Sequence, residues 1–275
     1  MDADRPPVVA VDAVGATTAA ALHGLLDAPG PAPRTGEALP PLWQWLAFLP
    51  AAAQRDLGPD GHPAIDPVLP PAALPKRMFA GGRSRSNGTL AVDSAIERSS
   101  RVTSMTEKVG RSGRLVFVTV EHALGPLDGP PVLVEEQDLV YREDGGEPSP
   151  PLPERAEVDG DWDLALDLDV DPTLLFRFSA LTYNAHRIHY DRRYATEVEG
   201  YPGLVVHGPL QAIALAELCR RDIGRRLASF EFRAVRPVFD DGPLRLRGRR
   251  QGDAVTLSSF DGAGRPAVTA TATLA

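Results

Sequence analysis

The sequence predicts an α+β protein in which a helix followed by antiparallel strands occurs twice. A helical segment at about 13–27 precedes strand-like residues between about 76 and 142. A second helical segment at about 208–223 precedes strand-like residues up to 274. Short turn sequences separate neighbouring strand segments, as in antiparallel meanders. We therefore expect two copies of one fold side by side, a duplication that rests on element order because the halves show no direct sequence similarity.

The first half combines helical segments with proline-rich turns. The segment AVGATTAAALHGLLD (13–27) predicts the first helix, and the apolar residues 42–57 predict a short helix broken by Pro50. Residues 28–41 and 58–75 are rich in Pro and Gly, which favours turns. Strands are then predicted over three β-branched or alternating segments, at 94–110, 114–124 and 132–143, with tight turns at 110–113 and 126–131.

A stretch rich in Pro, Gly and charge at 143–160 predicts a linker between the halves, 1–142 and 161–275. In the second half, GPLQAIALAELCRRDI (208–223) is apolar on nearly every face of its first two turns, so it is expected to lie inside a sheet. Pro209 suits its first turn and Gly224 the position after its end. Four strands are expected to follow, at 230–239, 243–250, 254–260 and 266–274.

Composition excludes several classes of protein. The net charge of -8 over 275 residues argues against a nucleic-acid-binding protein. The chain has no apolar stretch of 18 residues, so no membrane span is expected. Its first residues are acidic rather than basic, which favours a cytoplasmic protein over a secreted one. Cys219 is the only cysteine, which excludes an intrachain disulfide and a cysteine-rich metal site.

Polar side chains concentrate between 184 and 191, where the sequence has no strong helix or strand period. Asn184, His186, His189 and Asp191 lie there, and His207-Gly208 then opens the apolar helix. Polar groups on a loop, followed by a helix N-terminus, can hold an anionic intermediate. His186 and His189 have a spacing that zinc sites use, but no acidic or thiolate ligands accompany them. We therefore expect no metal, and no dinucleotide motif predicts another cofactor.

These residues resemble the MaoC-like hydratases and dehydratases, which act on enoyl- and hydroxyacyl-thioesters. The matching residues in the second half are Phe178, Ser179, Leu181, Asn184, Ile188, His189, Asp191, Ala195, His207 and Gly208. The chain is still more similar to the double hot-dog subgroup, which includes mesaconyl-C4-CoA hydratases and hydroxyacyl-thioester dehydratases. That similarity covers roughly 40–275 through LGPDGHP (57–63), LPKRMFAGG (74–82), TEKVGRSGRLVFVTVEH (106–122), VEEQDLVYRE (134–143) and LTYNAHRIHYDRRYATEVEGYPGLVVHGPLQA (181–212).

The resemblance implies a double hot-dog, with two curled antiparallel sheets that each wrap around a central helix. It implies a hydro-lyase that interconverts an enoyl-thioester and its 3-hydroxyacyl-thioester without a cofactor. One active site per chain is expected, in the second half, with the first half forming the acyl pocket. Asn184 departs from the aspartate of single hot-dog hydratases. An amide can orient water but cannot act as a base near neutral pH.

We expect His189 to be the acid and base, because a histidine can move a proton near neutral pH. Asn184 would hold the water, or it is only a turn former. The backbone N–H of Gly208 or of Gly203 would face the thioester oxygen. Substrate contacts are expected from Tyr183, His186, His207 and Arg77. Each has a structural alternative, since His207 could serve only the helix start and Arg77 could lie on the surface.

Three other functions stay open. A 3-hydroxyacyl dehydratase acting on acyl-carrier-protein substrates differs only in the carrier of the acyl group. A hot-dog thioesterase would need a carboxylate near the thioester, for which Asp191 is the candidate. A non-catalytic subunit that binds acyl-thioesters would explain the missing acid at Asn184. Because a fused pair already supplies the contact between two hot-dog units, either a monomer or a homodimer is expected.

Overall fold

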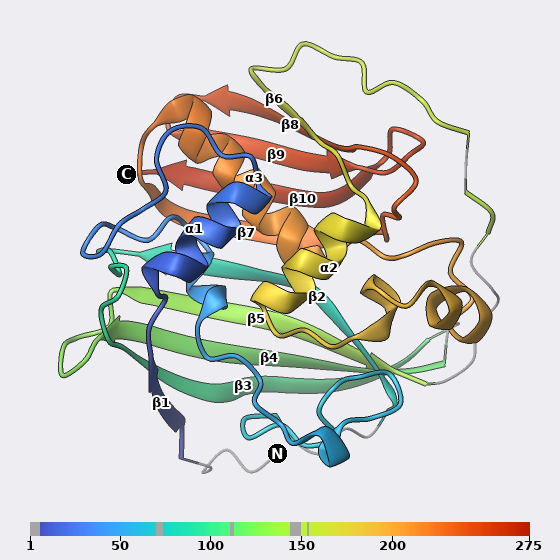
Figure 1. Ribbon diagram of the computed structural model, residues 1–275, viewed down its shortest axis with the longest axis horizontal. Helices are drawn as coiled ribbons and strands as arrows, with labels where there is room; N and C mark the ends of the chain where they lie inside the picture. The colour runs from blue at the N-terminus through green and yellow to red at the C-terminus, as the bar shows by residue number, and fades with distance from the viewer. Residues whose placement is uncertain (1–5, 70–73, 111–112, 144–149, 153) are drawn as a thin grey trace.

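The computed structural model describes residues 6–69, 74–110, 113–143, 150–152 and 154–275. Strands of the first half are β1 (Val8–Asp12), β2 (Lys76–Ser86), β3 (Ile96–Gly110), β4 (Gly113–Pro126) and β5 (Leu133–Arg142). Strands of the second half are β6 (Leu164–Leu168), β7 (Leu227–Ala234), β8 (Leu244–Gln251), β9 (Ala254–Phe260) and β10 (Pro266–Leu274). The α-helices are α1 (Ala16–Leu25), α2 (Pro172–Leu181) and α3 (Gly208–Ile223), which lie on one face of the sheet (Figure 1).

All strands join one antiparallel sheet in the order β1-β3-β4-β5-β2-β7-β10-β9-β8-β6. From the edge of the sheet to its centre, the strand order is β1-β3-β4-β5-β2 in the first half and β6-β8-β9-β10-β7 in the second. The two halves therefore repeat the same strand order. The structure has one continuous sheet, however, where two separate sheets were expected.

The halves join where β2 pairs with β7, from Gly81 opposite Arg233 to Arg85 opposite Ser229. A Cβ atom at Gly81 would lie 2.5 Å from the carbonyl oxygen of Phe232. One at Gly82 would lie 2.8 Å from the carbonyl oxygen of Glu136 on the other side. Since no side chain fits in these gaps, the Gly pair of the RMFAGG segment serves close strand packing.

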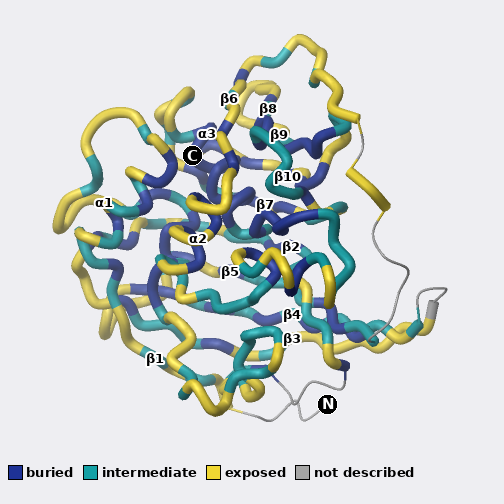
Figure 2. Tube along the Cα trace, turned by 45° about the vertical axis from the view of Figure 1, so that its right-hand side comes forward, coloured by how far each residue is buried: buried dark blue, intermediate teal, exposed yellow. Residues whose placement is uncertain are grey.

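Helix α3 is the centre of the core. Every residue from Leu210 to Cys219 is buried, and Figure 2 shows buried positions gathered along α3 and the strands beside it. The predicted bounds are confirmed, because Pro209 lies in the first turn and Gly224 adopts φ 69° just after the last residue. An amphipathic surface helix would expose one face, so α3 is buried on all sides by the sheet and neighbouring segments.

The first half has no counterpart of α3 among its described residues. The predicted helix at 42–57 is wrong, because only one-turn 3-10 helices form there, at Trp43–Leu46 and Gln54–Asp56. Leu42 and Phe48 have φ values of 68° and 58°, which end helical geometry on both sides of the buried Trp43. The helix at 13–27, expected at the centre of the first half, forms as α1 but packs against α2 and Trp43–Leu46, and the sheet of this half faces a cavity instead.

The remaining predictions are mostly confirmed. The helix at 13–27 corresponds to α1, and the predicted strands of both halves correspond to β3, β4, β5 and β7 to β10. Strands β1 and β6 and helix α2 were missed, and β2 was covered only by the general strand-like range from 76 to 142. The turn at 110–113 and the linker at 143–160 lie partly outside the described residues. No helix of the described part is long and apolar enough to cross a membrane.

Candidate active site

The end of α2 fixes where the polar loop begins. Asp171 accepts a hydrogen bond from the Leu174 N–H at 2.7 Å and so caps the start of the helix. At the other end, the N–H groups of Tyr183 and Asn184 return to the carbonyls of Ala180 and Ser179. This is a Schellman ending with Tyr183 in the left-handed position, at φ 48°. The chain thereby turns sharply and delivers Asn184 to the cavity.

Asn184 both shapes the loop and lines the cavity. Its Oδ1 accepts a hydrogen bond from the His186 N–H at 3.0 Å, which closes a turn across Ala185. Asn184 therefore does form a turn, as the structural alternative for this residue predicts. The side chain is partly exposed in the cavity wall, where its Nδ2 group can still donate to a water or hydroxyl oxygen.

His189 is held in one tautomer by the backbone. Its Nδ1 lies 2.7 Å from the carbonyl oxygen of Val205, which can only accept, so Nδ1 carries the proton. The lone pair is therefore on Nε2. The side chain lines the cavity while only 7% of the residue is exposed. Burial lowers the pKa of His189 to about 4, despite the opposing hydrogen bond to Val205, so the imidazole is a neutral base at pH 7.

The ring of His207 packs against the ring of His189. The two rings stack with centroids 3.7 Å apart, and His207 Nε2 lies 2.9 Å from Ser179 Oγ. His207 is completely buried and does not line the cavity, and burial lowers its pKa well below the ordinary value. This placement favours a supporting role over the substrate contact expected from the sequence.

The two candidate oxyanion donors lie in different places. Gly208 is the first residue of α3 and lines the cavity beside Phe79. The first N–H groups of a helix have no carbonyl partner within the helix, and Pro209 has no N–H at all. Gly203 lies outside the cavity lining, packed so closely that a Cβ atom there would be 2.8 Å from Asp240 Oδ1. The geometry therefore favours Gly208.

A loop from the first half completes the site, and sequence reasoning did not assign it a role there. The His62 and His186 rings lie 4.1 Å apart, and His186 lies 5.4 Å from His189. Asp60 accepts from His62 Nδ1 at 2.9 Å and from the His62 N–H at 3.0 Å. The segment LGPDGHP carried these residues, but only its resemblance to other chains marked it.

Burial keeps these histidines neutral. It lowers the pKa of His186 to about 2, with a further contribution from the neighbouring His62 and His189 rings. It also lowers the pKa of His62, although the bond to Asp60 opposes the shift. Burial would raise the pKa of Asp60, but the hydrogen bonds from His62 outweigh it and lower that pKa to about 2. The carboxylate is thus ionised and accepts the proton of His62 Nδ1.

Asp60, His62 and His186 are also the residues of the described chain that could hold a metal ion, since their ligand atoms lie within 4.8 Å of one another. This group contains His186 but not His189, so it differs from the His186–His189 pair that the sequence offered as a zinc site. The bond from His62 Nδ1 to Asp60 fixes the imidazole with a neutral Nε2, which suits either a metal or a hydrogen-bonded substrate.

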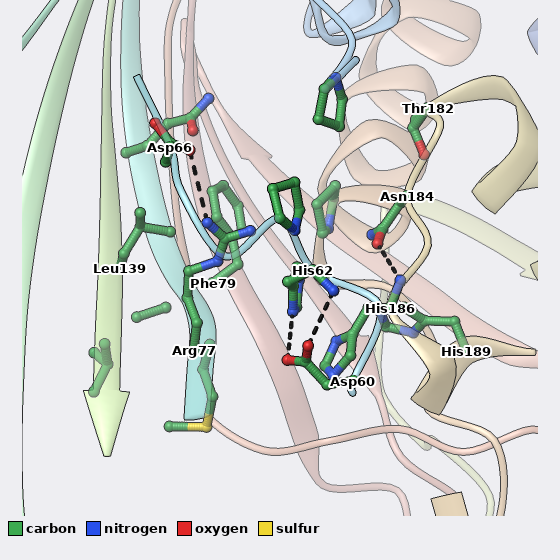
Figure 3. A pocket seen from close by; sticks show the side chains of 18 of the residues that line it. Asp60, His62, Asp66, Arg77, Phe79, Leu139, Thr182, Asn184, His186 and His189 are labelled. Atoms are coloured by element: carbon green, nitrogen blue, oxygen red, sulfur yellow. Dashed lines mark hydrogen bonds and ion pairs between the residues drawn. The ribbon is translucent and has the colours of Figure 1, made fainter. Parts of the chain in front are cut away.

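The cavity measures about 3590 Å³ and lies against both halves of the sheet. Arg77, Asn184, His186 and His189 line it (Figure 3). Tyr183 lines it too, but 60% of this residue is exposed. Asp191 is outside the lining, where its carboxylate binds Arg187 at 2.8 Å and caps the following helical turn through the Tyr194 N–H. This leaves Asp191 unsuited to attack a thioester.

Residues 42–240 match the model of a family described as hydroxyacyl-thioester dehydratase type 2. The chain belongs to this family. It is 45% identical over 256 residues to a mesaconyl-C(4)-CoA hydratase from Chloroflexus aurantiacus, covering 93% of this chain and 91% of that relative. A mitochondrial hydroxyacyl-thioester dehydratase type 2 from Schizosaccharomyces pombe is 42% identical over 78 residues, which is 27% of this chain and 26% of the relative.

Solved structures share the fold. HtdX of Mycobacterium tuberculosis has a TM-score of 0.67 at 18% identity and covers 98% of this chain and 100% of its own. A MaoC-like dehydratase from Phytophthora capsici has a TM-score of 0.69 at 15% identity, covering 99% and 96%. A second M. tuberculosis protein, described as having a double hot-dog fold, has a TM-score of 0.58 at 12% identity and covers 98% of this chain and 96% of its own. The chain therefore has the hot-dog fold.

Proposed function

We propose that this chain is a hydro-lyase that adds water to the double bond of a short enoyl-CoA thioester and removes it in the reverse direction. The observation that carries the proposal is the arrangement of His189. A buried neutral imidazole, with Nδ1–H fixed on the Val205 carbonyl, lines the same cavity as Gly208 at the start of α3. The 45% identity to a mesaconyl-C(4)-CoA hydratase supports the same reaction class.

In the hydration direction, His189 Nε2 takes a proton from water as the water oxygen bonds to the β-carbon. The electrons of the double bond move to the thioester oxygen, which forms an enolate. The N–H of Gly208 at the helix start stabilises this charge. The imidazolium then returns its proton to the α-carbon, so the net change is the addition of one water molecule. Asn184 Nδ2 holds the attacking water.

The two halves have different roles in this proposal. Residues 161–275 supply the acid-base group and the oxyanion donor. Residues 1–142 supply the acyl pocket, and 143–160 connect the two. The described residues of the first half contain no counterpart of α3, which supports this division, because the sheet of that half lines the cavity instead. We also propose a cytoplasmic location, which suits the buried thiol of Cys219.

Hydration of crotonyl-CoA and mesaconyl-C4-CoA by the purified chain tests the proposal. We expect the enoyl absorbance to fall without release of free thiol. Thiol release would favour a thioesterase, a function that the position of Asp191 argues against. Binding without turnover would favour the non-catalytic subunit. The same assay with acyl-carrier-protein thioesters shows whether the chain prefers CoA or the carrier protein as the carrier of the acyl group.

A further inference from the structure

The loop of the first half that carries His62 brings a second imidazole to the cavity beside His189. His62 lines the cavity, and 19% of its side chain is exposed. Its ring lies 4.1 Å from the ring of His186, which in turn lies 5.4 Å from the ring of His189. A positive charge on His62 would lower the pKa of His189, so the two imidazoles are close enough for their charges to interact. Figure 3 shows His62, Asn184 and His189 gathered in one part of the pocket.

Both oxygens of the Asp60 carboxylate bind His62. Oδ2 accepts from the ring Nδ1 at 2.9 Å, and Oδ1 accepts from the backbone N–H at 3.0 Å. Since the carboxylate can only accept, Nδ1 carries the proton and Nε2 carries a lone pair, which is a stronger acceptor for having this partner. No other described residue hydrogen-bonds with this ring, so Nε2 is left for a molecule in the cavity. The side chain of His186 has no hydrogen bond to a described residue that would fix its tautomer in the same way.

The attacking water has one hydrogen atom that the proposed chemistry does not assign to any residue. One O–H bond breaks as His189 Nε2 takes the proton, and the other O–H bond remains on the oxygen. Shut into the cavity by the thioester, that second O–H needs an acceptor. Asn184 does not provide one, because an amide that turns Nδ2 to the water turns Oδ1 away from it. Asn184 Oδ1 already accepts from the His186 N–H.

We propose that His62 is a second catalytic residue, whose Nε2 accepts the hydrogen that stays on the attacking oxygen, while Asp60 holds the ring in place. The inference rests on the proposed function, since it concerns the same water. No proton moves to His62, because the hydrogen that it binds becomes the hydroxyl hydrogen of the 3-hydroxyacyl product. In the dehydration direction the same bond holds the leaving hydroxyl group while His189 protonates it. The first half then contributes to the chemistry as well as to the acyl pocket.

Two substitutions of His62 separate this role from a structural one. An asparagine places its Nδ2 near the position of the histidine Nδ1, so His62→Asn keeps the bond to Asp60 and loses the acceptor. We expect it to lower the hydration of crotonyl-CoA at least about 30-fold, with little change in thermal unfolding. A glutamine can place its Oε1 near the position of Nε2. His62→Gln should therefore retain at least about fivefold more turnover than His62→Asn.

A substitution on the other side of the water tests the same hydrogen bond. Asn184→Asp removes a donor and adds a carboxylate acceptor. Alone, it should lower turnover. In the His62→Asn chain it should raise turnover at least about threefold, because the carboxylate accepts the hydrogen that has lost its partner. His122→Ala is the matched control, since His122 also lines the cavity from the first half but bonds to Ser100 Oγ, at 2.8 Å. Combined with His122→Ala, Asn184→Asp should lower turnover as it does alone.

The proposal is overturned if His62→Asn keeps turnover within about threefold of the unmodified chain. It is also overturned if Asn184→Asp lowers turnover equally with and without His62→Asn. Failure of the proposed function looks different, because the unmodified chain would then hydrate neither crotonyl-CoA nor mesaconyl-C4-CoA.

Discussion

Gly61 and the carbonyl oxygen of Ala185 are in such close contact that a Cβ atom at Gly61 would lie only 1.9 Å from that oxygen. Gly61 also has φ +93°, a conformation that other residues rarely adopt. The contact docks the loop of the first half onto the polar loop of the second. Two further bonds reinforce it, from the Arg187 N–H to the Asp60 carbonyl and from Arg187 Nη1 to the Pro59 carbonyl.

We predict that Gly61→Ala lowers hydration turnover about tenfold or more, because the new methyl group forces the two loops apart and displaces His62 and His186 relative to His189. Gly36→Ala is a matched control, with φ +81° and no atom within 4 Å of the new Cβ. It should lower the free energy of unfolding by about 1 to 2 kcal/mol and leave turnover unchanged. Equal turnover in the two variants would show that the docking contact is not needed.

His189→Asn should lower turnover by about 10²- to 10⁴-fold, the range for loss of a general acid and base. The asparagine amide can still donate to the Val205 carbonyl, so the buried acceptor keeps a partner and the fold is preserved. Circular dichroism and thermal unfolding check the fold, and loss of enoyl absorbance measures turnover. A rate near that of the unmodified chain would refute the assignment of His189.

Substitutions at Asn184 separate its two roles. Asn184→Asp keeps an oxygen that accepts from the His186 N–H but removes the Nδ2 donor. If Asn184 holds the water, turnover should change at least about tenfold with little change in thermal stability. Asn184→Ala, which loses the turn as well, should lower both. An Asp variant that matches the unmodified chain in rate would assign Asn184 to turn formation alone.

Acid should destabilise the fold before most carboxylates titrate. Folding lowers the pKa of His186 and His189 from 6.5 to about 2 and about 4. Below pH 6.5 the unfolded chain therefore binds more protons than the folded chain, and stability falls as the pH falls. The buried His189 alone contributes up to about 1.4 kcal/mol per pH unit between 6.5 and 4. Urea unfolding at pH 7, 6 and 5 measures the slope, which His189→Asn should reduce; an unchanged slope would contradict this origin.

Removal of metal ions should not affect turnover. The proposed chemistry uses an imidazole, a helix N-terminus and an amide, none of which requires a metal. We expect dialysis against EDTA to leave the hydration rate unchanged. Loss of activity that Zn²⁺ restores would instead indicate an ion at Asp60, His62 and His186, and His62→Ala should then abolish the restoration.

The parts of the fold that follow from local sequence could be predicted. Helix α3 was located through Pro209, Gly224 and its apolar faces, and the strands through their residue types and turns. Helix α2 was missed, although Asp171-Pro172 is a capping pair that could have located it. The helix expected around Trp43 was wrong because tertiary burial, not helical periodicity, accounts for its apolar residues.

In the site, too, residues that are close in sequence could be predicted to lie together, and residues joined by tertiary contacts could not. Asn184, His186 and His189 lie on one short segment, so their proximity could be read from the chain. Asp60 and His62 lie more than a hundred residues earlier, and only tertiary contacts such as that of Gly61 with Ala185 bring them to His186. The left-handed turn at Tyr183 was also hidden, because glycine or asparagine is the usual signal for that conformation.

The junction of β2 with β7 has a consequence for how ligands come and go. The backbone hydrogen bonds between β2 and β7 join the halves in one sheet, so a hinge between the halves would break those bonds. We expect entry of a thioester and release of its product to depend instead on movement of the cavity-lining rim segments, chiefly 47–58 and 196–201. If release limits the rate, substitutions in those rim segments will change turnover without touching any reacting atom.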